Sequence, residues 1–197
     1  ETLSGSSLTY GLGGKGANQA AAAARSGIPT LFVGAVGTDL AGHSLRTHLA
    51  AHGVDVSHLR EVDSPSGTAL ITVAASGENT IILDAGANRA SSIAHAKASL
   101  FPAPSDIVVL QAEIPPAANA AAIEWAHSFG ARVLLNLAPA RPTDPTTLSR
   151  VDILVVNETE AGLTLGMPAP ATPTEAIGVA RALRGMGPRH VVVTLGA

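Results

Sequence analysis

Short apolar runs alternate with helix-forming segments along most of this 197-residue chain. The runs are continuous and rich in β-branched residues, which is typical of strands that helices cover on both faces of a parallel sheet. The alternation predicts an α/β fold with a doubly wound, mostly parallel sheet, helices on both faces and right-handed crossovers. The runs are residues 31–36, 107–110, 133–137, 153–156 and 191–195. The helical segments, each followed by a glycine that can end a helix, are residues 17–26, 39–52, 117–129 and 174–186.

One region departs from this alternation. Two apolar segments, residues 67–75 and 80–83, flank a short polar turn, which predicts a β-hairpin. We expect this hairpin to form part of a small lid over one end of the sheet. The sequence therefore predicts one α/β domain over residues 1–197, with lid strands within residues 1–10 and 67–83.

Composition excludes several classes of protein. The net charge is −3, so no basic surface is expected for nucleic acid. Cysteine is absent, which excludes disulfides and thiolate metal sites and fits a reducing compartment. No run of about 18 uninterrupted apolar residues occurs, so we expect no membrane span and no membrane partner. These features favour a globular protein of the cytoplasm.

A glycine-rich loop precedes the first helical segment. Residues 11–18 contain four glycines together with Lys15 and Asn18, and an alanine run follows them. Glycine permits positive φ and close approach of the backbone to another molecule, because it has no Cβ. The lysine offers three donors and a charge, and the asparagine amide both donates and accepts. The loop is therefore expected to hold a small polar ligand.

Three general interpretations of this loop fit poorly. Residues 11–16 formally match the dinucleotide-binding pattern, which also needs a buried strand before it and an acidic residue about 20 positions later. The preceding residues 6–10 are too polar for that strand, and Asp39 does not follow a strand end. The P-loop pattern fails because a glycine follows the lysine. A tight turn with an incidental lysine leaves the pairing of Lys15 with Asn18 unexplained.

Residues 13–20, with the sequence Gly-Gly-Lys-Gly-Ala-Asn-Gln-Ala, resemble the N-terminal signature of the ribokinase family of sugar kinases, also called PfkB-type carbohydrate kinases. Leu137 departs from the family's pattern, since it stands where the Asn-Pro-Ala-Pro segment has its first proline. The resemblance spans essentially the whole chain. Its further motifs follow in the family's order and lie at residues 84–88, 110–113, 136–140, 156–160 and 193–196.

The resemblance implies that the glycine-rich loop and one glutamate bind the sugar. An ionised carboxylate can accept hydrogen bonds from two neighbouring hydroxyl groups. Glu113 follows a predicted strand, and ligands of open α/β sheets bind outside the carboxyl ends of the strands. The alternative is a surface carboxylate that caps residues 114–116. The implied sugar-binding residues are Gly13, Gly14, Lys15, Gly16, Ala17, Asn18 and Glu113.

The resemblance also implies a nucleotide site. Asn157, Thr194 and Gly196 would bind the nucleotide, and Glu160 would hold Mg²⁺ through water. Oxygen ligands with retained waters suit this ion. The alternative for Asn157 and Glu160 is a capping box at a helix start, which is compatible with the ligand role. The implied cofactors are ATP and Mg²⁺, with a monovalent cation such as K⁺ in a full-length protein.

A histidine pair offers a separate metal hypothesis. His48 and His52 lie four residues apart in the helix predicted at 39–52 and could face one ion. A catalytic zinc site needs three protein ligands, and the neighbouring sequence offers no clear third. A solvated helix face is therefore the expectation.

The implied activity is that of an ATP-dependent sugar kinase, with phosphorylation of D-ribose to D-ribose 5-phosphate as the favoured reaction. Two alternatives stay open: a kinase for a nucleoside, fructose or 2-keto-3-deoxygluconate, and a non-catalytic sugar or nucleotide sensor. The sugar and ATP are the expected partners, together with a homodimer formed through the lid.

The family's general-base aspartate belongs to an Asp-x-x-Gly-Ala-Gly-Asp motif, which residues 1–197 do not contain. No catalytic residue is therefore expected in this chain. The family's first strand has no counterpart either, and the chain begins with Glu1 rather than methionine. We expect the chain to be an incomplete and inactive part of a longer protein.

Overall fold

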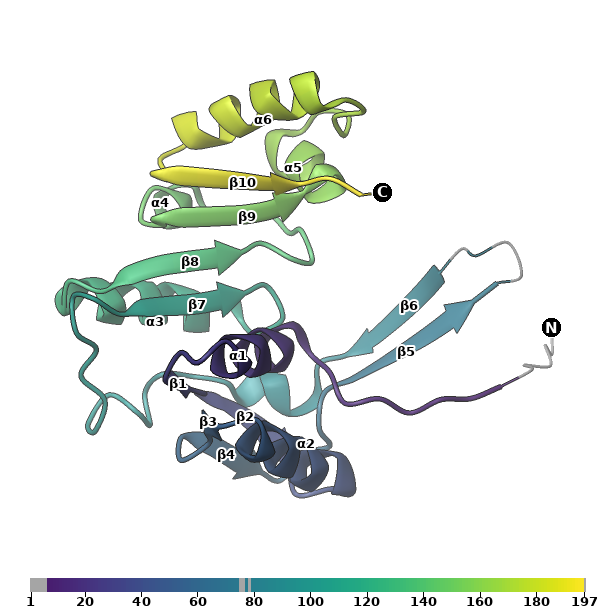
Figure 1. The fold of residues 1–197 in the computed structure, drawn as a ribbon, viewed down its shortest axis with the longest axis vertical. Coiled ribbons are helices and arrows are strands. Elements are labelled where there is room, and N and C mark those ends of the chain that lie inside the picture. Colours follow the sequence, from purple (N-terminus) through teal and green to yellow (C-terminus); the bar gives the residue numbers. More distant parts are fainter. Residues whose placement is uncertain (1–6, 75–76, 78, 197) are drawn as a thin grey trace.

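The computed structural model describes residues 7–74, 77 and 79–196. These residues form a body of parallel strands and helices, from which one β-hairpin extends (Figure 1). Within the described ranges, no helix combines the length and the apolar character that crossing a bilayer requires.

The second half of the body is built on a four-stranded parallel sheet. Its order is β10-β9-β8-β7, so each new strand is added beside the previous one. Because the strands are parallel, their carboxyl ends meet at one edge, where Gln111 pairs with Asn136 and Asn157 pairs with Thr194. The strands are β7 (Ile107–Gln111), β8 (Arg132–Asn136), β9 (Ile153–Asn157) and β10 (His190–Thr194).

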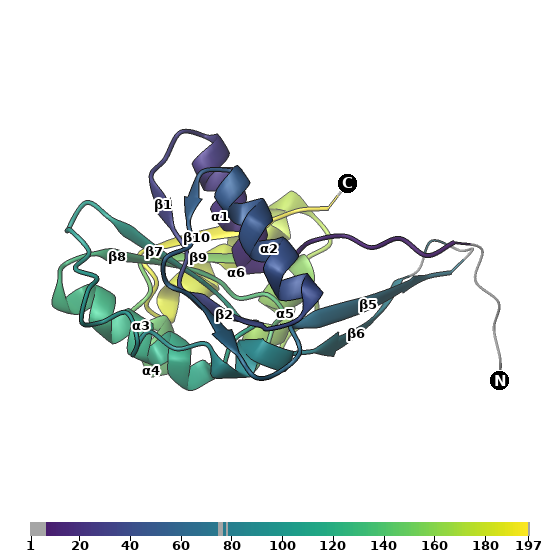
Figure 2. The same ribbon diagram turned by 90° about the horizontal axis from the view of Figure 1, so that it is seen from below.

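Helices connect these strands and enclose the main core. The core side chains Leu135, Leu154 and Leu183 are at most 2% exposed. Burial of each such side chain contributes about 1.5–3 kcal/mol to folding. Figure 2 shows α3 on one side of β7 and β8 and α1 on the other. The helices of this half are α3 (Pro116–Ser128), α4 (Pro145–Leu148), α5 (Glu158–Leu165) and α6 (Pro173–Gly185).

The first half of the body has two short parallel sheets. The strand β1 pairs with β3, and β2 pairs with β4. A smaller core, which includes Leu49, Val54 and Leu59, fills the space between these sheets and the two helices. The elements are α1 (Lys15–Arg25), β1 (Thr30–Leu31), β2 (Gly34–Gly37), α2 (Leu40–Ala51), β3 (Val54–Asp55) and β4 (Leu59–Val62).

The predicted α/β fold is confirmed, and all four predicted helices form with ends shifted by one or two residues. The strand predicted at 31–36 differs: it divides into β1 and β2, because the ladder changes its partner strand between Leu31 and Gly34. As a result, the parallel strands described here lie in three separate sheets rather than in one. The short strands β3 and β4 carry exposed charged residues, so no apolar run marks them in the sequence.

The predicted hairpin is confirmed as β5 (Thr68–Val73) paired antiparallel with β6 (Asn79–Asp84), followed by the 3₁₀ helix η1 (Gly86–Ala90). Every residue of both strands is exposed. Of the lid strand expected within residues 1–10, residues 7–10 form no strand, and residues 1–6 lie outside the described residues. Figures 1 and 2 show that the chain before α1 nevertheless extends from the body on the same side as the hairpin.

Candidate functional site

The start of α1 and the end of β7 meet at the carboxyl edge of the sheet. The backbone N–H of Lys15 donates to the Glu113 carboxylate at 2.8 Å between N and Oε2, across 98 positions of sequence. A carboxylate is favourable there because the N-terminus of a helix carries partial positive charge. The preceding Gly14 has a φ of 97°, which turns the chain into the helix. The structure therefore brings two of the predicted sugar-binding residues together.

The helix begins two residues earlier than predicted, at Lys15 instead of residue 17. Lys15 and Asn18 consequently lie on its first turn, three residues apart, where side chains are neighbours on a helix surface. Lys15 is half-buried and Asn18 is exposed. The next N–H groups, of Gly16 and Ala17, belong to the first turn and have no acceptor within the helix. This turn thus offers backbone donors and two polar side chains to a ligand.

Two glutamines that the sequence analysis missed join α1 to β7. The Gln111 amide nitrogen Nε2 donates to the Gln19 oxygen Oε1 at 2.5 Å. A Cβ on Gly16 would lie 3.0 Å from the Gln111 oxygen Oε1 and 3.3 Å from the Phe32 ring, so only glycine fits this approach without displacing a neighbour. Gln111 could have been found from the sequence, because it is a polar residue at the end of an apolar strand, two positions before Glu113.

Two further residues hold the loop that carries Glu113. The buried Asn119 of α3 donates from Nδ2 to the Gln111 backbone oxygen at 2.7 Å. Arg141, which follows β8, donates to the backbone oxygen of Ile114 at 2.8 Å. Partial burial lowers the pKa of the Arg141 guanidinium from its usual value. The position of Glu113 is therefore fixed from α1, α3 and the segment after β8.

The predicted nucleotide residues lie at the ends of β9 and β10. Asn157 and Glu160 form a complete capping box at the start of α5: the Asn157 oxygen Oδ1 accepts from Glu160 N at 2.8 Å, and the Glu160 oxygen Oε2 accepts from Asn157 N at 2.9 Å. The predicted capping arrangement is thus confirmed. Thr194 lies at the end of β10, and its hydroxyl is 3.4 Å from the Val156 backbone oxygen.

Gly196 is also tied to α5. Its N–H donates to the Glu158 carboxylate at 2.5 Å, and this hydrogen bond lowers the pKa of Glu158. Glu158 was not predicted as a site residue, because nothing in the sequence pattern connects it to a glycine 38 positions later. The start of α5 and the end of β10 therefore form one polar edge.

Two observations bear on metal ions. The capping box engages one oxygen of Glu160 and leaves its other carboxylate oxygen for a hydrated cation, so the donor set fits an ion that keeps most of its waters. Among the residues described, no three His, Asp or Glu side chains cluster as a direct ligand set. His48 is exposed on α2 and His52 is half-buried at its C-terminal cap, and the His52 ring nitrogen Nδ1 lies 2.8 Å from the His48 backbone oxygen.

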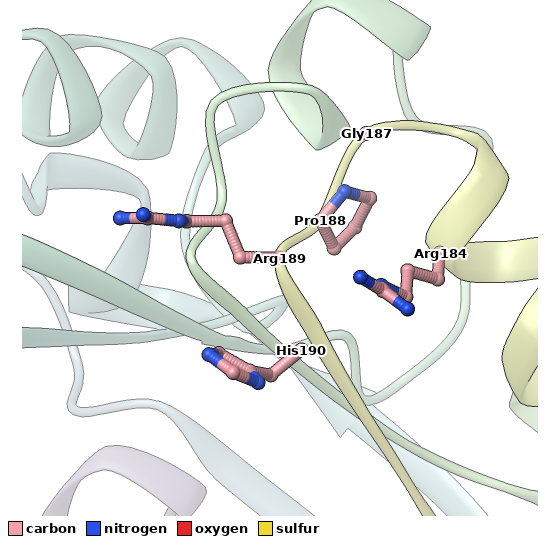
Figure 3. A pocket seen from close by; sticks show the side chains of 5 residues that line it. All are labelled: Arg184, Gly187, Pro188, Arg189 and His190. Carbon is pink, nitrogen blue, oxygen red and sulfur yellow. The ribbon is translucent and has the colours of Figure 1, made fainter.

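An open hollow of about 460 Å³ lies at the opposite end of β10 from Thr194 (Figure 3). It is formed by the loop between α6 and β10 and holds no predicted site residue. In Figure 3 the Arg189 side chain points away from Arg184. The hollow is lined by Arg184, Gly187, Pro188, Arg189 and His190.

Comparison with known proteins assigns this chain to a family. The sequence profile described as "pfkB family carbohydrate kinase" matches residues 1–197. The ribokinase of Haemophilus influenzae is 37% identical over 100% of this chain and 65% of its own length. The deoxyribokinase of Salmonella typhi is 35% identical over the same shares.

A solved structure agrees. The Arabidopsis thaliana ribokinase, complexed with ribose and ATP, matches 100% of this chain and 64% of its own with a TM-score of 0.87 and 33% identity. The chain thus spans about 65% of the length of the relatives it matches.

Proposed function

Because the chain belongs to the pfkB family of carbohydrate kinases, we propose that it carries the sugar-binding edge and part of the nucleotide site of an ATP-dependent ribokinase. One contact carries the proposal: the hydrogen bond from Lys15 N–H to the Glu113 carboxylate. This contact brings the glycine-rich turn and the acidic strand end to one place. The Arabidopsis relative, whose structure contains ribose and ATP, supports this choice of ligands.

The sugar would lie between the first turn of α1 and Glu113. A pentose presents several hydroxyl groups on a compact ring, which short polar side chains and bare backbone can contact closely. Glu113 keeps a second carboxylate oxygen, Oε1, that can accept from sugar hydroxyls while Oε2 holds Lys15 N–H. Lys15, Asn18 and the N–H groups of the first turn would donate to the sugar oxygens.

The phosphates would lie over the polar edge formed by α5 and the end of β10. Asn157 would donate from its Nδ2 atom, because Oδ1 is engaged in the capping box. Glu160 would hold Mg²⁺ through water, and a bound Mg²⁺ neutralises developing charge on the phosphates. In-line phosphoryl transfer depends chiefly on such positioning and charge stabilisation.

We expect the 197 residues by themselves to bind sugar without turning it over. The Asp-x-x-Gly-Ala-Gly-Asp motif, which supplies the general base in this family, is absent from them. An assay with ribose, ATP and Mg²⁺ tests this expectation. Turnover at the usual kinase rate of roughly 1–100 s⁻¹ would contradict it.

Calorimetric titration of the chain with D-ribose, 2-deoxy-D-ribose and D-fructose tests the proposed substrate. We expect ribose to bind most tightly, because a site built to hydrogen-bond a hydroxyl group rejects an analogue that lacks it. The likeness to the Salmonella deoxyribokinase supports a second candidate, 2-deoxyribose, and tighter binding of that sugar would favour it. Absence of binding by all three sugars would overturn the proposed function.

The hairpin would serve as the lid and as a contact between two copies. Its strands expose apolar side chains on both faces, so one face remains apolar when the other covers a ligand. An exposed sheet of this kind favours pairing with a second, identical sheet.

A further inference from the structure

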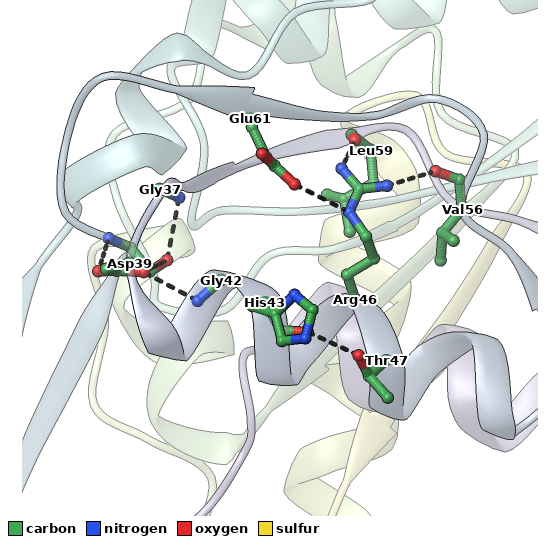
Figure 4. Close-up of polar contacts among 10 residues, drawn as sticks. Gly37, Asp39, Gly42, His43, Arg46, Thr47, Val56, Leu59 and Glu61 are labelled. Atoms are coloured by element: carbon green, nitrogen blue, oxygen red, sulfur yellow. Dashed lines mark hydrogen bonds and ion pairs between the residues drawn. The ribbon is translucent and has the colours of Figure 1, made fainter.

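The root of the hairpin holds a compact group of hydrogen bonds around Asp39. The Asp39 oxygen Oδ2 accepts from Ser66 N at 2.8 Å, and Oδ1 accepts from the Ser66 hydroxyl at 2.6 Å. Oδ1 also accepts from Gly42 N at 2.8 Å, which caps α2. The Ser66 hydroxyl in turn accepts from Gly37 N at 2.9 Å. Figure 4 shows how these contacts join the end of β2, the start of α2 and the segment before β5.

The surrounding backbone is packed too closely for side chains. A Cβ on Gly37 would collide with the Ser64 backbone oxygen, and a Cβ on Gly42 would collide with the Gly37 oxygen. After the returning strand, at the start of η1, a Cβ on Gly86 would collide with the Pro65 oxygen. Both strands of the hairpin are therefore held at one point.

The described residues of β5 and β6 have no comparable support from the body of the protein. Each residue of β5 and β6 is exposed, so packing against the body does not fix its direction. Ser66, by contrast, is 7% exposed and lies two residues before β5. The return is tied to the same place, because Ala87 N donates to the Pro65 oxygen at 2.8 Å.

The hydrogen bonds lower the pKa of Asp39, the Ser66 hydroxyl bond most of all. The carboxylate therefore stays ionised and accepts from three donors around neutral pH. A neutral amide in its place would turn one acceptor into a donor that faces N–H or O–H groups. Replacing one carboxylate oxygen of Asp39 with an amide nitrogen is therefore expected to disrupt these hydrogen bonds.

We propose that Asp39 and Ser66 are positioning residues that set the direction in which the β5–β6 hairpin leaves the body. Asp39 is the N-cap of α2, and Ser66 lies two residues before β5, so their hydrogen bonds connect the body directly to the hairpin. That this orientation places the hairpin over a sugar rests on the proposed function. The orientation itself does not, because it involves no ligand.

Distances between two spin labels test the proposal. The chain has no cysteine, so Thr72→Cys in β5 and Ser128→Cys in α3 give two unique label sites, both exposed. The labelled parent is compared with the same protein carrying Ser66→Ala or Asp39→Asn. The matched control is Asp55→Asn, because the Asp55 carboxylate accepts from Ser57 N at 2.8 Å in a turn away from the hairpin.

We expect one narrow distance distribution in the parent and in Asp55→Asn, and a broadened or displaced one in Ser66→Ala and Asp39→Asn. A merely structural role would lower the melting temperature without changing the distribution measured well below it. Ser66→Ala keeps the α2 cap, so it remains informative if Asp39→Asn does not fold. Equal distributions in Ser66→Ala and the control, with equal helix content, would overturn the proposal.

Ribose titration of the same proteins separates this proposal from the proposed function. Loss of the two hydrogen bonds that the Ser66 hydroxyl makes should weaken ribose binding by about threefold to tenfold in Ser66→Ala, and Asp55→Asn should leave it unchanged. If the parent does not bind ribose, the proposed function fails while the label distances still decide the role of the root. If the distances change and ribose affinity does not, the root orients the hairpin but the hairpin does not cover the sugar.

Discussion

At the scale of single residues, the Glu113 carboxylate has one observed hydrogen-bond partner and one proposed partner. Its oxygen Oε2 accepts a hydrogen bond from Lys15 N–H. This N–H lies in the first turn of α1 and has no carbonyl acceptor within the helix. The other oxygen would accept from the sugar in the proposed site. A glutamine at this position would keep an acceptor but lose the charge that suits the start of a helix.

Truncation of Glu113 should therefore weaken sugar binding. In Glu113→Ala we expect ribose affinity to fall by about 1.5–3 kcal/mol, the range for hydrogen bonds to a charged group, in a calorimetric titration. Glu124→Ala is the matched control, since Glu124 is exposed and pairs with Arg150 on the surface, at 3.2 Å. Ribose affinity in Glu113→Ala equal to that of the control would remove Glu113 from the site.

At the scale of elements, α5 and α6 offer two helix starts with similar caps and different surroundings. Asn157 caps α5 through Glu160 N, next to the end of β10. Thr172 caps α6 through Glu175 N at 3.2 Å, and both residues are exposed at a helix start that follows a loop rather than a strand end. Substitutions at the two caps can therefore distinguish an effect on helix stability from an effect on ligand binding.

Alanine at each cap should lower the free energy of unfolding by about 1 kcal/mol. We expect only Asn157→Ala to weaken ATP–Mg²⁺ binding as well, because its Nδ2 donor would be lost with the cap. Chemical denaturation measures the first effect, and nucleotide titration measures the second. Equal nucleotide affinity in Asn157→Ala and Thr172→Ala would assign Asn157 to the helix cap alone.

At the scale of the whole molecule, the sequence was most informative where local pattern and burial agree. The helices were predictable because their apolar positions and stop glycines lie within one segment, and β8 and β9 because they are buried in the middle of a sheet. The division of residues 31–36 was not predictable, because it depends on which strand each half meets.

In the candidate site, too, local motifs were predictable from the sequence and contacts between distant segments were not. The glycine-rich turn and Glu113 could be identified from family motifs, but the Lys15–Glu113 hydrogen bond spans 98 positions and the Gln19–Gln111 contact spans 92. Such pairs arise from packing of α1 against β7 and leave no mark on local sequence. The Asp39–Ser66 group joins residues 27 positions apart and is hidden for the same reason.

The two faces of the hairpin differ in a way that makes the proposed homodimer specific. Alternation along the strands and the observed register place Ile71 opposite Ile81 on one face, with Val73 and Leu83 beside them. The other face has Leu70 opposite Ile82, between the polar pairs of Thr72 with Thr80 and Thr68 with Asp84. The first face is the more continuous apolar surface, so we expect a second copy to pack there.

Lysine substitution on each face tests that expectation by sedimentation. Ile81→Lys should dissociate the dimer. Burial of one isoleucine contributes about 1.5 kcal/mol or more, and a lysine adds the cost of burying a charge. Together these effects should lower the dimer affinity at least about tenfold. Ile82→Lys is the matched control, as a neighbour of similar exposure, 62% against 55%, on the opposite face. Dissociation by Ile82→Lys alone would move the interface to the other face, and a parent that sediments as a monomer would remove the hairpin from any contact between copies.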